Sequence, residues 1–377
     1  MLKSLLVFTR GDFLLLFLTS GQLRSYAEAM TTSTPALVIN KANAPMVRES
    51  IERRDVRPKD VRVKIAYSGI CHSDVHQARS EWGNDIFPMV TGHEMVGHVV
   101  EVGSDVKKFK VGQTVGVGVF VDSCRTCDAC KADQESYCEK GPVPSYNGYA
   151  HDGSVELGGY SQEIVTDEHF VLHIPDGVDL AECAPLLCAG ITVYSPLKHW
   201  GAAKGKKVAI LGMGGLGHLA VKFAVAMGAE VTVLGHSLSK KEDALSFGAV
   251  DYRSTAEEQT FVDLAKKFDF ILNTTSADIP IDGLLGMIKM DGALVFVGLP
   301  VDSQSFNVFS VTSQRRSISG SQVGGQVEVQ EMLNFAAKHK IGSTIELLDA
   351  TDPATIDAAW DRVVDADVRY RFVIDAS

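Results

Sequence analysis

Four cysteines crowd into a short stretch of this chain. They are Cys124, Cys127, Cys130 and Cys138, separated by two, two and seven residues. Four soft thiolate ligands suit a closed tetrahedral zinc site, which usually has a structural role. An iron–sulfur cluster is the alternative, but the ferredoxin spacing ends with a three-residue gap and a Cys-Pro pair, and here Glu139 follows a longer gap. The odd total of seven cysteines argues against a secreted disulfide framework, so we expect a structural zinc site.

A second set of metal-ligand types is scattered along the chain. Cys71 opens a Cys-His-Ser-Asp-x-His stretch, His93 and Glu94 stand next to each other, and Cys188 lies far downstream. Each signal is weak alone, because a single cysteine is more often part of the core. Together, Cys71, His93 and Cys188 supply the ligands of a catalytic zinc that keeps one position open. Glu94 is either a fourth ligand in the resting state or a carboxylate behind the ligands.

Two further side chains near Cys71 could move a proton. An open zinc ion polarises a substrate oxygen and lowers the pKa of a bound alcohol, so an alkoxide forms near neutral pH. Ser73 and His76 follow Cys71 closely. A hydroxyl beside the zinc, linked to a histidine, is a plausible proton relay to solvent. The alternative for His76 is a surface histidine of a loop.

A glycine-rich segment indicates a dinucleotide site. The residues Gly212, Gly214, Gly215, Leu216 and Gly217 belong to a Gly-x-Gly-x-x-Gly pattern. The pattern follows an expected strand and opens an expected helix, and this context makes it specific. The glycines allow a tight turn and let a pyrophosphate approach the helix N-terminus. We expect a nicotinamide dinucleotide here.

The next strand ends in a turn that favours NADP(H) over NAD(H). Sites that prefer NAD place an acidic residue there to bind the ribose 2′-hydroxyl, and this turn has none. It carries His236, Ser237, Lys240 and Lys241 instead, which suit a 2′-phosphate. A solvated basic turn without a cofactor role is the alternative.

The hydrophobic pattern predicts the strands and helices that position these residues. It divides the chain into a β-rich stretch and a stretch of alternating strands and helices. From about residue 35 to 185, short alternating segments such as 61–67 and 95–102 predict strands separated by turns. From 207 onward, apolar strands alternate with helical segments, which predicts βαβ units and a parallel sheet. We expect a helix at 329–340 and a last strand at 370–375 that rejoins the β-rich part.

Length and charge set further limits. The chain has 377 residues, enough for about two domains, and a formal charge of −11, which argues against nucleic acid or an anionic membrane as a partner. Residues 1–29 do not match the rest. Their apolar run 13–18 is too short to span a membrane, so we expect a mis-called start codon or an unstructured leader, with a targeting segment as the alternative. We expect a cytoplasmic protein.

With these motifs, the chain resembles the zinc-dependent medium-chain dehydrogenases, and within them the cinnamyl-alcohol-dehydrogenase-like group of NADP-dependent alcohol dehydrogenases. The resemblance runs from about residue 35 to the C-terminus. It rests on the four-cysteine segment, the glycine loop and the segments 69–76, 92–97, 185–195 and 367–375.

The resemblance implies an α/β chain with two domains. These are a GroES-like β-rich catalytic domain (30–187 and 328–377) and an inserted Rossmann domain with a doubly wound parallel sheet (188–327). It also implies two zinc ions per chain, NADP(H), a small alcohol or aldehyde substrate bound in the cleft, and a homodimer. Ser73 and His76 would then form the relay, and Thr192 and Val297 would join the cofactor site.

The substrate pocket departs from that of the plant lignin enzymes, which use bulky aromatic residues. We place Trp82, Pro144 and Gln322 in the pocket. The segment 141–144 stands where the plant enzymes carry a Trp, and Gln322 stands where they carry a Phe. We therefore expect a broad aldehyde reductase rather than a cinnamyl-specific enzyme. The rivals are a zinc-free quinone or enoyl reductase, which would lack both ligand sets, and a non-enzymatic protein with the same fold.

Overall fold

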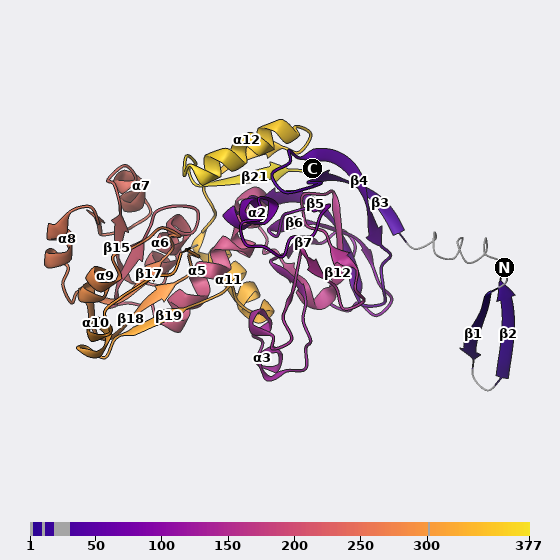
Figure 1. Cartoon of the computed structure of the whole chain (residues 1–377), viewed down its shortest axis with the longest axis horizontal. Coiled ribbons are helices and arrows are strands. Elements are labelled where there is room, and N and C mark those ends of the chain that lie inside the picture. The colour runs from indigo at the N-terminus through magenta and orange to yellow at the C-terminus, as the bar shows by residue number, and fades with distance from the viewer. Residues whose placement is uncertain (1–2, 10–11, 19–30, 301) are drawn as a thin grey trace.

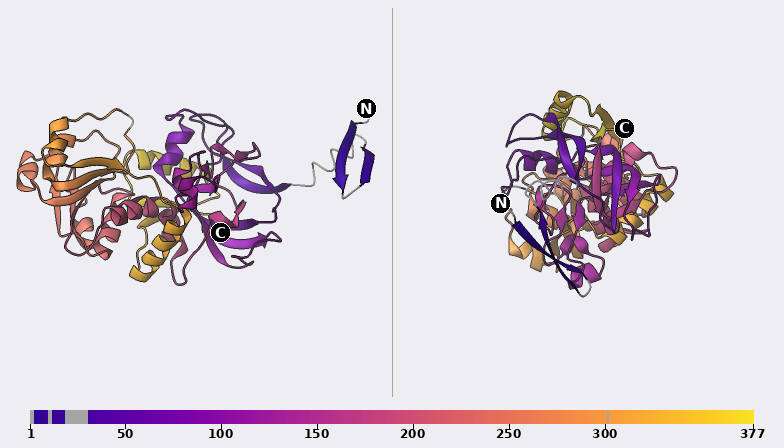
Figure 2. Two further views of the ribbon diagram at one scale, coloured as in Figure 1. Left: turned by 90° about the horizontal axis from the view of Figure 1, so that it is seen from below. Right: turned by 90° about the vertical axis from the view of Figure 1, so that its right-hand side faces the viewer.

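The computed structural model describes residues 3–9, 12–18, 31–300 and 302–377. Two parts lie side by side along the long axis of the molecule, a β-rich part and an α/β part (Figures 1 and 2). A separate antiparallel hairpin of β1 (Lys3–Thr9) and β2 (Asp12–Leu18) stands apart from both parts. We expected an unstructured leader in these two stretches, but backbone pairing makes them strands. Residues 19–30 lie outside the described residues, so the leader over 1–29 stays a prediction.

The β-rich part is built on one seven-stranded sheet, ordered β13-β7-β6-β5-β21-β20, with β12 also paired to β5. The expected return of the C-terminal strand is confirmed, because β21 runs antiparallel to β5. β5 is buried at nearly every position, although its apolar residues alternate with polar ones such as Arg62, which pairs with Glu101 and Glu163. The strands of this sheet are β5 (Asp60–Gly69), β6 (Met95–Val102), β7 (Thr114–Val117), β12 (Glu163–Asp167), β13 (Val171–His173), β20 (Ile345–Asp349) and β21 (Arg371–Asp375).

Smaller elements surround this sheet. The two-stranded pairs are β3 (Thr31–Val38) with β4 (Val47–Arg54), β8 (Phe120–Asp122) with β9 (Val143–Pro144), and β10 (Gly148–Tyr149) with β11 (Val155–Glu156). The helical segments are α2 (His72–Ala78), α3 (Asp128–Lys131), η1 (Glu135–Tyr137), η2 (Glu168–Phe170), α4 (Leu180–Cys183), η3 (Ala184–Leu187) and α12 (Pro353–Val364). In Figure 1, α3 lies on the loop that extends from the β-rich part at the bottom of the view.

The α/β part is a six-stranded parallel sheet, ordered β16-β15-β14-β17-β18-β19. Numbered within the part, this order is 3-2-1-4-5-6, that of a doubly wound dinucleotide-binding sheet. Its strands are β14 (Lys207–Leu211), β15 (Glu230–Gly235), β16 (Asp251–Ser254), β17 (Phe268–Asn273), β18 (Ile288–Phe296) and β19 (Ser317–Gly320). Its helices are α5 (Ala189–His199), α6 (Gly217–Ala226), α7 (Lys241–Ser246), α8 (Glu258–Asp263), α9 (Ile281–Met287), α10 (Val308–Thr312) and α11 (Gln326–His339).

The continuous apolar strands of this sheet are explained by helices on both faces. In β14, Val208 and Ile210 pack into the cluster that contains residues of α5, α6 and α11. Ala209 and Leu211 point to the opposite face and pack with residues of α9. Alternate side chains of a strand point to opposite faces, so β14 must be apolar throughout. This arrangement fixes the edge at which the parallel strands end, where a dinucleotide binds in such sheets.

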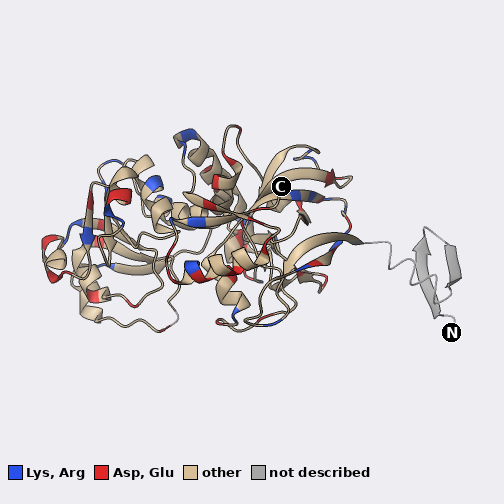
Figure 3. Ribbon diagram, turned by 90° about the horizontal axis from the view of Figure 1, so that it is seen from above, with Lys and Arg blue, Asp and Glu red and all other residues tan. Residues whose placement is uncertain are grey.

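Two surface properties complete the description. Acidic and basic residues are interspersed over both parts (Figure 3). Within the described residues no single helix is long and apolar enough to cross a membrane, although the bent pair Leu180–Leu187 and Ala189–His199 meets the criteria of length and composition when joined.

Candidate active site

The four cysteines of the sequence pattern converge on one point. The segment 124–138, which we call the four-cysteine lobe, places the sulfur atoms of Cys124, Cys127, Cys130 and Cys138 within 4.8 Å of one another. The Sγ atoms of Cys124 and Cys130 are 3.9 Å apart. This matches the edge of about 3.8 Å in a tetrahedron with zinc–sulfur bonds of about 2.3 Å. The geometry and the donor chemistry therefore fit a closed zinc site.

Backbone amides support charged sulfur atoms in this lobe. The amide of Cys127 donates to Cys124 Sγ at 3.3 Å, and the amide of Cys130 donates to Cys127 Sγ at 3.5 Å. Hydrogen bonds from Thr126 and the Cys127 amide lower the pKa of Cys124 to about 5. The thiolate is the form that binds metal.

The scattered ligand candidates also come together. Cys71 precedes α2, His93 and Glu94 precede β6, and Cys188 precedes α5. One ligand atom from each of these four residues lies within 4.8 Å of the other three. A hydrogen bond with Cys188 holds the pKa of Cys71 well below its usual range, which favours the metal-binding thiolate. Two thiolates, an imidazole and a nearby carboxylate fit an open zinc site.

A buried aspartate orders this group. Asp74 is fully buried, and its Oδ1 lies 3.1 Å from His93 Nδ1. Its Oδ2 accepts the amide of Cys71 at 2.9 Å and the hydroxyl of Tyr160 at 3.1 Å. A carboxylate on Nδ1 fixes the ring orientation and leaves Nε2 free to act as a ligand. Asp74 thus positions two ligand candidates at once.

Glu94, the fourth residue of this metal group, is paired with Arg371 of the C-terminal strand β21. Glu94 is completely buried and accepts two hydrogen bonds from Arg371 Nη2, at 2.6 and 2.7 Å. Burial raises the pKa of Glu94 to about 7 against the opposing effect of Arg371. The Arg371 side chain also lies against the glycine loop, because a Cβ on Gly215 would be 2.8 Å from Arg371 Cδ. Arg371 therefore connects the metal group to the loop.

The two relay candidates stand on the helix that follows Cys71. Ser73 Oγ is 3.6 Å from Cys71 Sγ, and His76 lies about one turn further along α2. The His76 ring pairs through Nδ1 with Glu81 and stacks on Trp82, with ring centroids 4.9 Å apart. Glu81 is 41% exposed, so the His76–Glu81 pair reaches solvent.

The glycine loop has the shape that a pyrophosphate needs. Gly212 has a φ of +95°, which forms the tight turn after β14. A Cβ on Gly217 would lie 2.2 Å from the Gly212 carbonyl oxygen, so helix and strand pack too closely for a side chain. Nothing lies within 4 Å of a Cβ on Gly214, where the backbone is open to a ligand. The three glycines thus fill the three roles of a dinucleotide loop.

The other cofactor candidates follow neighbouring strand ends. His236 and Ser237 follow β15 and are exposed, and Val297 follows β18. Lys240 caps α7, its Nζ lies 5.2 Å from the centre of the Tyr370 ring, and Lys241 opens that helix. Thr192 is buried on α5, one turn after Cys188. The carboxyl ends of parallel strands meet at one edge, so the residues that follow β15 and β18 lie at the same edge of the sheet as the glycine loop.

The three pocket candidates have different surroundings. Trp82 stacks on the relay candidate His76. Pro144 lies in β9, two residues before Tyr146, whose ring stacks on His93 at 5.7 Å. Gln322 is exposed and donates its amide to Tyr137 of the four-cysteine lobe at 3.0 Å.

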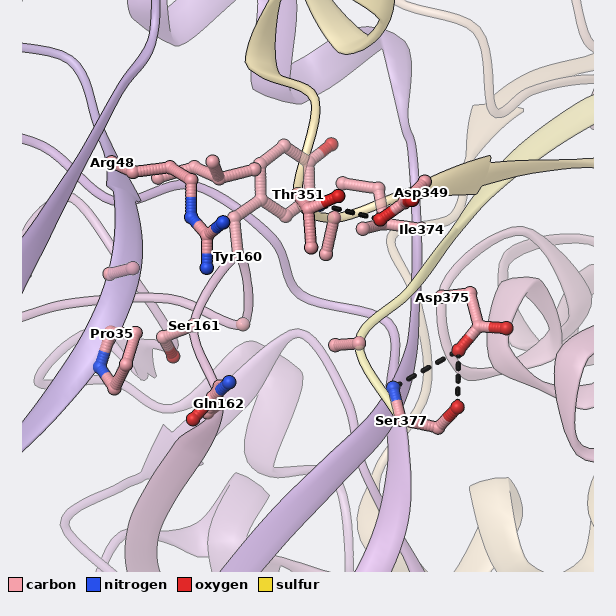
Figure 4. A pocket seen from close by; sticks show the side chains of 15 residues that line it. Pro35, Arg48, Tyr160, Ser161, Gln162, Asp349, Thr351, Ile374, Asp375 and Ser377 are labelled. Carbon is pink, nitrogen blue, oxygen red and sulfur yellow. Dashed lines mark hydrogen bonds between the residues drawn. The ribbon is translucent and has the colours of Figure 1, made fainter.

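A separate cavity of about 110 Å³ lies in the β-rich part beside β3, β4 and the end of β21 (Figure 4). It is lined by residues that include Pro35, Arg48, Tyr160, Asp349 and Thr351. None of the predicted metal, cofactor or pocket residues lines it.

Comparison with known proteins decides the family. Residues 57–176 match the alcohol dehydrogenase GroES-like domain, and residues 215–338 match the zinc-binding dehydrogenase family. The chain belongs to the zinc-binding alcohol dehydrogenase family. The predicted fold class, a GroES-like domain joined to a Rossmann domain, is confirmed.

Several relatives of this alcohol dehydrogenase are similar along nearly their whole length. It is 53% identical over 344 residues to the probable formaldehyde dehydrogenase AdhA of Bacillus subtilis, which covers 91% of this chain and 98% of the relative. It is 52% identical over 347 residues to NADP-dependent alcohol dehydrogenase C 1 of Mycolicibacterium smegmatis, covering 92% and 99%. The resemblance to NADP-dependent alcohol dehydrogenases is therefore confirmed.

Two solved structures agree. Cinnamyl alcohol dehydrogenase SbCAD4 from Sorghum bicolor has a TM-score of 0.88 at 38% identity, covering 91% of this chain and 98% of that one. The CAD from Helicobacter pylori complexed with NADP(H) has a TM-score of 0.85 at 41% identity, covering 92% and 99%.

Four residues of this dehydrogenase site were not predicted from the sequence. Asp74 and Glu81 stand close to the Cys71 motif, where a carboxylate near an expected histidine was a usable signal. Arg371 is a charged residue in an apolar terminal strand, which also pointed to a buried partner. Tyr146 gave no signal, because only the fold brings it against His93.

Proposed function

We propose that this alcohol dehydrogenase is an NADP(H)-dependent aldehyde reductase with two zinc ions per chain, one catalytic and one structural. The observation that carries the proposal is the convergence of Cys71, His93, Glu94 and Cys188. Cys71, His93 and Cys188 would hold the catalytic zinc, and the four-cysteine lobe the structural one. We keep the division into a catalytic domain (30–187 and 328–377) and a cofactor domain (188–327).

The chemistry of reduction divides between bound groups and side chains. A zinc ion held at the catalytic site would polarise the carbonyl oxygen of an aldehyde, and NADPH on the glycine loop would supply the hydride. Asp74 keeps the His93 ring in the orientation that presents Nε2. Arg371 holds Glu94 through two hydrogen bonds. The carboxylate would therefore stay beside the three ligands even when it does not bind the zinc ion.

The side chains of α2 would deliver the proton. Ser73 Oγ stands beside Cys71 and would donate its proton to the developing alkoxide. His76 would restore that proton from Nε2, because its Nδ1 pairs with Glu81. The partly exposed Glu81 connects this path to solvent. The path runs in the opposite direction during alcohol oxidation.

NADP(H) is supported by the turn after β15. His236, Ser237, Lys240 and Lys241 provide hydroxyl and cationic groups, and no acid occupies the position that would bind a free 2′-hydroxyl. A relative with 52% identity is named as NADP-dependent, and a related structure is complexed with NADP(H).

We propose aromatic and medium-chain aldehydes as a broad substrate class. Trp82, Pro144 and Gln322 would line the pocket, and exposed Gln322 replaces an apolar wall with a polar one. The relatives carry names as different as formaldehyde, cinnamyl alcohol and mannitol dehydrogenase, which fits a scaffold whose pocket varies.

A homodimer is supported by the free edge of the parallel sheet. Among the described residues β19 pairs with β18 alone, so its outer edge presents unpaired backbone groups. Val308 and Phe309 of the nearby α10 are 65% and 73% exposed. We propose that a second copy covers this edge. We also propose a cytoplasmic location, because thiol ligands persist in a reducing compartment.

Metal content and activity of Cys71→Ser test the proposal. We expect about two zinc ions in the unaltered protein and about one in the variant. Turnover should be lost, and NADPH binding should stay near normal because the glycine loop is unchanged. Cys183→Ala is the matched control, since Cys183 is buried away from both groups and should keep both metals. A fully active Cys71→Ser variant would refute the catalytic zinc.

The substrate and cofactor require a separate measurement. Oxidation of NADPH is followed with aliphatic, aromatic and terpenoid aldehydes, with NADH in parallel. We expect several aldehydes to react and NADPH to be strongly preferred. Equal rates with NADH would contradict the cofactor assignment.

A further inference from the structure

The four-cysteine lobe touches more than its own loop. It belongs to the β-rich part, yet two of its side chains accept hydrogen bonds from the α/β part. The donors are backbone amides at the two ends of the turn 321–325, which joins β19 to α11. Tyr137 OH accepts the amide of Gln322 at 3.0 Å, and Glu135 Oε2 accepts the amide of Gln326 at 3.0 Å. The lobe therefore holds this turn at both ends.

The contact at Glu135 supplies a cap that α11 does not make for itself. Gly325 occupies the N-cap position, so the helix has no capping side chain of its own. The Glu135 side chain is 2% exposed and places a carboxylate against the first turn, where the helix dipole favours negative charge. Its other oxygen lies 2.6 Å from His169 Nε2, which fixes the carboxylate in place.

The fit between lobe and turn is close. A Cβ on Gly325 would lie 1.8 Å from the carbonyl oxygen of Asp133, so only glycine lets the two backbones approach. Val323 has a φ of +49°, an unfavourable conformation for a β-branched residue. Such a conformation persists only where the surroundings hold it, and it occurs often at ligand clamps.

The turn also packs against the helix that starts at the metal group. A Cβ on Gly324 would lie 2.8 Å from Ile191 Cδ1. Ile191 stands on α5, which begins directly after the ligand candidate Cys188. The turn follows the carboxyl end of β19, the edge of the sheet at which ligands bind in this fold. It therefore lies between the lobe and α5, at the ligand-binding edge of the sheet.

We propose that Glu135 and Tyr137 are positioning residues for the substrate, because they clamp the turn that carries Gln322. The inference rests on the proposed function, and it gives the lobe a role beyond holding its own loop together. Loosening the clamp should weaken aldehyde binding and spare the NADPH site, which is built by other strand ends.

The test uses the zinc-loaded full chain. The variants are Tyr137→Phe, which removes only the accepting hydroxyl, Glu135→Ala, which removes the cap, and Glu135→Gln, which keeps an accepting oxygen. Tyr149→Phe is the matched control, because Tyr149 is a highly exposed tyrosine of the same part. Measurements are KM for an aromatic aldehyde, kcat, Kd for NADPH, zinc content and hydrogen–deuterium exchange of the peptide spanning 318–333.

We expect Tyr137→Phe and Glu135→Ala to raise the aldehyde KM and the exchange rate at 322–326 by about five-fold each, the effect of one lost hydrogen bond. The zinc content, kcat and Kd for NADPH should stay within about two-fold of the unaltered chain, since no group that binds them changes. Glu135→Gln should stay close to the unaltered chain in both the aldehyde KM and the exchange rate, and Tyr149→Phe should change nothing.

Two results would overturn the proposal. One is an unchanged KM in both Tyr137→Phe and Glu135→Ala. The other is faster exchange together with a lower kcat, a higher KM and a weaker affinity for NADPH, all by similar factors, which indicates general destabilisation. If Glu135→Ala loses zinc, Tyr137→Phe alone decides. Failure of the proposed function is recognised separately, because the unaltered chain would then reduce no aldehyde while the exchange experiment still reports on the clamp.

Discussion

One guanidinium nitrogen of Arg371, Nη2, lies 2.6 Å and 2.7 Å from the two carboxylate oxygens of Glu94. The two residues are far apart in the sequence, and both are buried. The same nitrogen also lies 2.6 Å from the carbonyl oxygen of Ile70, directly before Cys71. The C-terminal strand is thereby fastened to the metal group by an ion pair that is almost completely buried.

The Arg371–Glu94 pair leads to a prediction about stability. Arg371→Leu leaves the Glu94 carboxylate buried without a counter-charge, which should lower the free energy of unfolding by about 3–5 kcal/mol. Arg369→Gln is the control, because Arg369 is 52% exposed in its pair with Asp243 and such pairs contribute about 0–1 kcal/mol. Urea unfolding of the two variants checks both values. Equal losses would show that the Arg371–Glu94 pair adds nothing specific.

The lobe and the catalytic group differ in how far the sequence predicts them. Cys124 to Cys138 are close in sequence, so their spacing alone indicated one metal site. The proposed catalytic ligands come from three separate segments, and only the sheet of β5, β6 and β21 brings Cys71, Glu94 and Arg371 together. Residue types alone indicated the ligand candidates. The residue that holds Glu94 in place, Arg371, could not be found in this way, because its contact depends on the register of the strands.

The same limit applies to the elements. The strand at 95–102 was predicted with its observed bounds, because its apolar residues mark it along its whole length. β16 and β19 were not predicted, since both are four residues long and lie at edges of the sheet. The free edge of β19 and the contacts of the turn 321–325 that follows it could therefore not be predicted from the sequence either.

A second prediction concerns cofactor preference. Lys241→Ala removes a cation from the turn proposed to bind the 2′-phosphate. A charge-assisted hydrogen bond contributes about 1.5–3 kcal/mol, so kcat/KM with NADPH should fall by about 10–100-fold. The value with NADH should stay unchanged, because NADH lacks the phosphate. Lys204→Ala, at an exposed lysine away from this turn, is the control. Parallel losses with both cofactors would contradict the assignment.

A third prediction concerns the edge of the parallel sheet. Phe309→Glu places a charge on the apolar surface next to β19 and should convert the proposed dimer into a monomer. Burial of an unpaired charge at an interface costs more than the lost apolar contact. Val262→Glu is the control, since Val262 is 68% exposed on another helix, α8. Sedimentation equilibrium measures the mass. A Phe309→Glu protein that stays dimeric would place the interface elsewhere.

A final prediction concerns His218, which joins the glycine loop to the β-rich part. Its Nδ1 lies 3.2 Å from the Gly214 carbonyl oxygen, and its Nε2 lies 3.2 Å from Ser343 Oγ and 3.3 Å from the Thr344 amide nitrogen. A carbonyl only accepts and an amide only donates, so the ring carries its single proton on Nδ1. Complete burial holds the pKa of His218 well below its usual value.

Below about pH 6.5 the unfolded chain therefore binds a proton at this histidine that the folded chain does not bind. Stability should be lost as the pH falls, by up to about 1.4 kcal/mol per pH unit from this group. His218→Gln removes the contribution, so its unfolding free energy should depend less steeply on pH between about 5 and 6.5. Urea unfolding over this range measures the slope, and the zinc ligands contribute equally to both proteins. His98→Gln, at an exposed histidine, should keep the original slope, and an identical slope for His218→Gln would show that its ring is protonated in the folded chain.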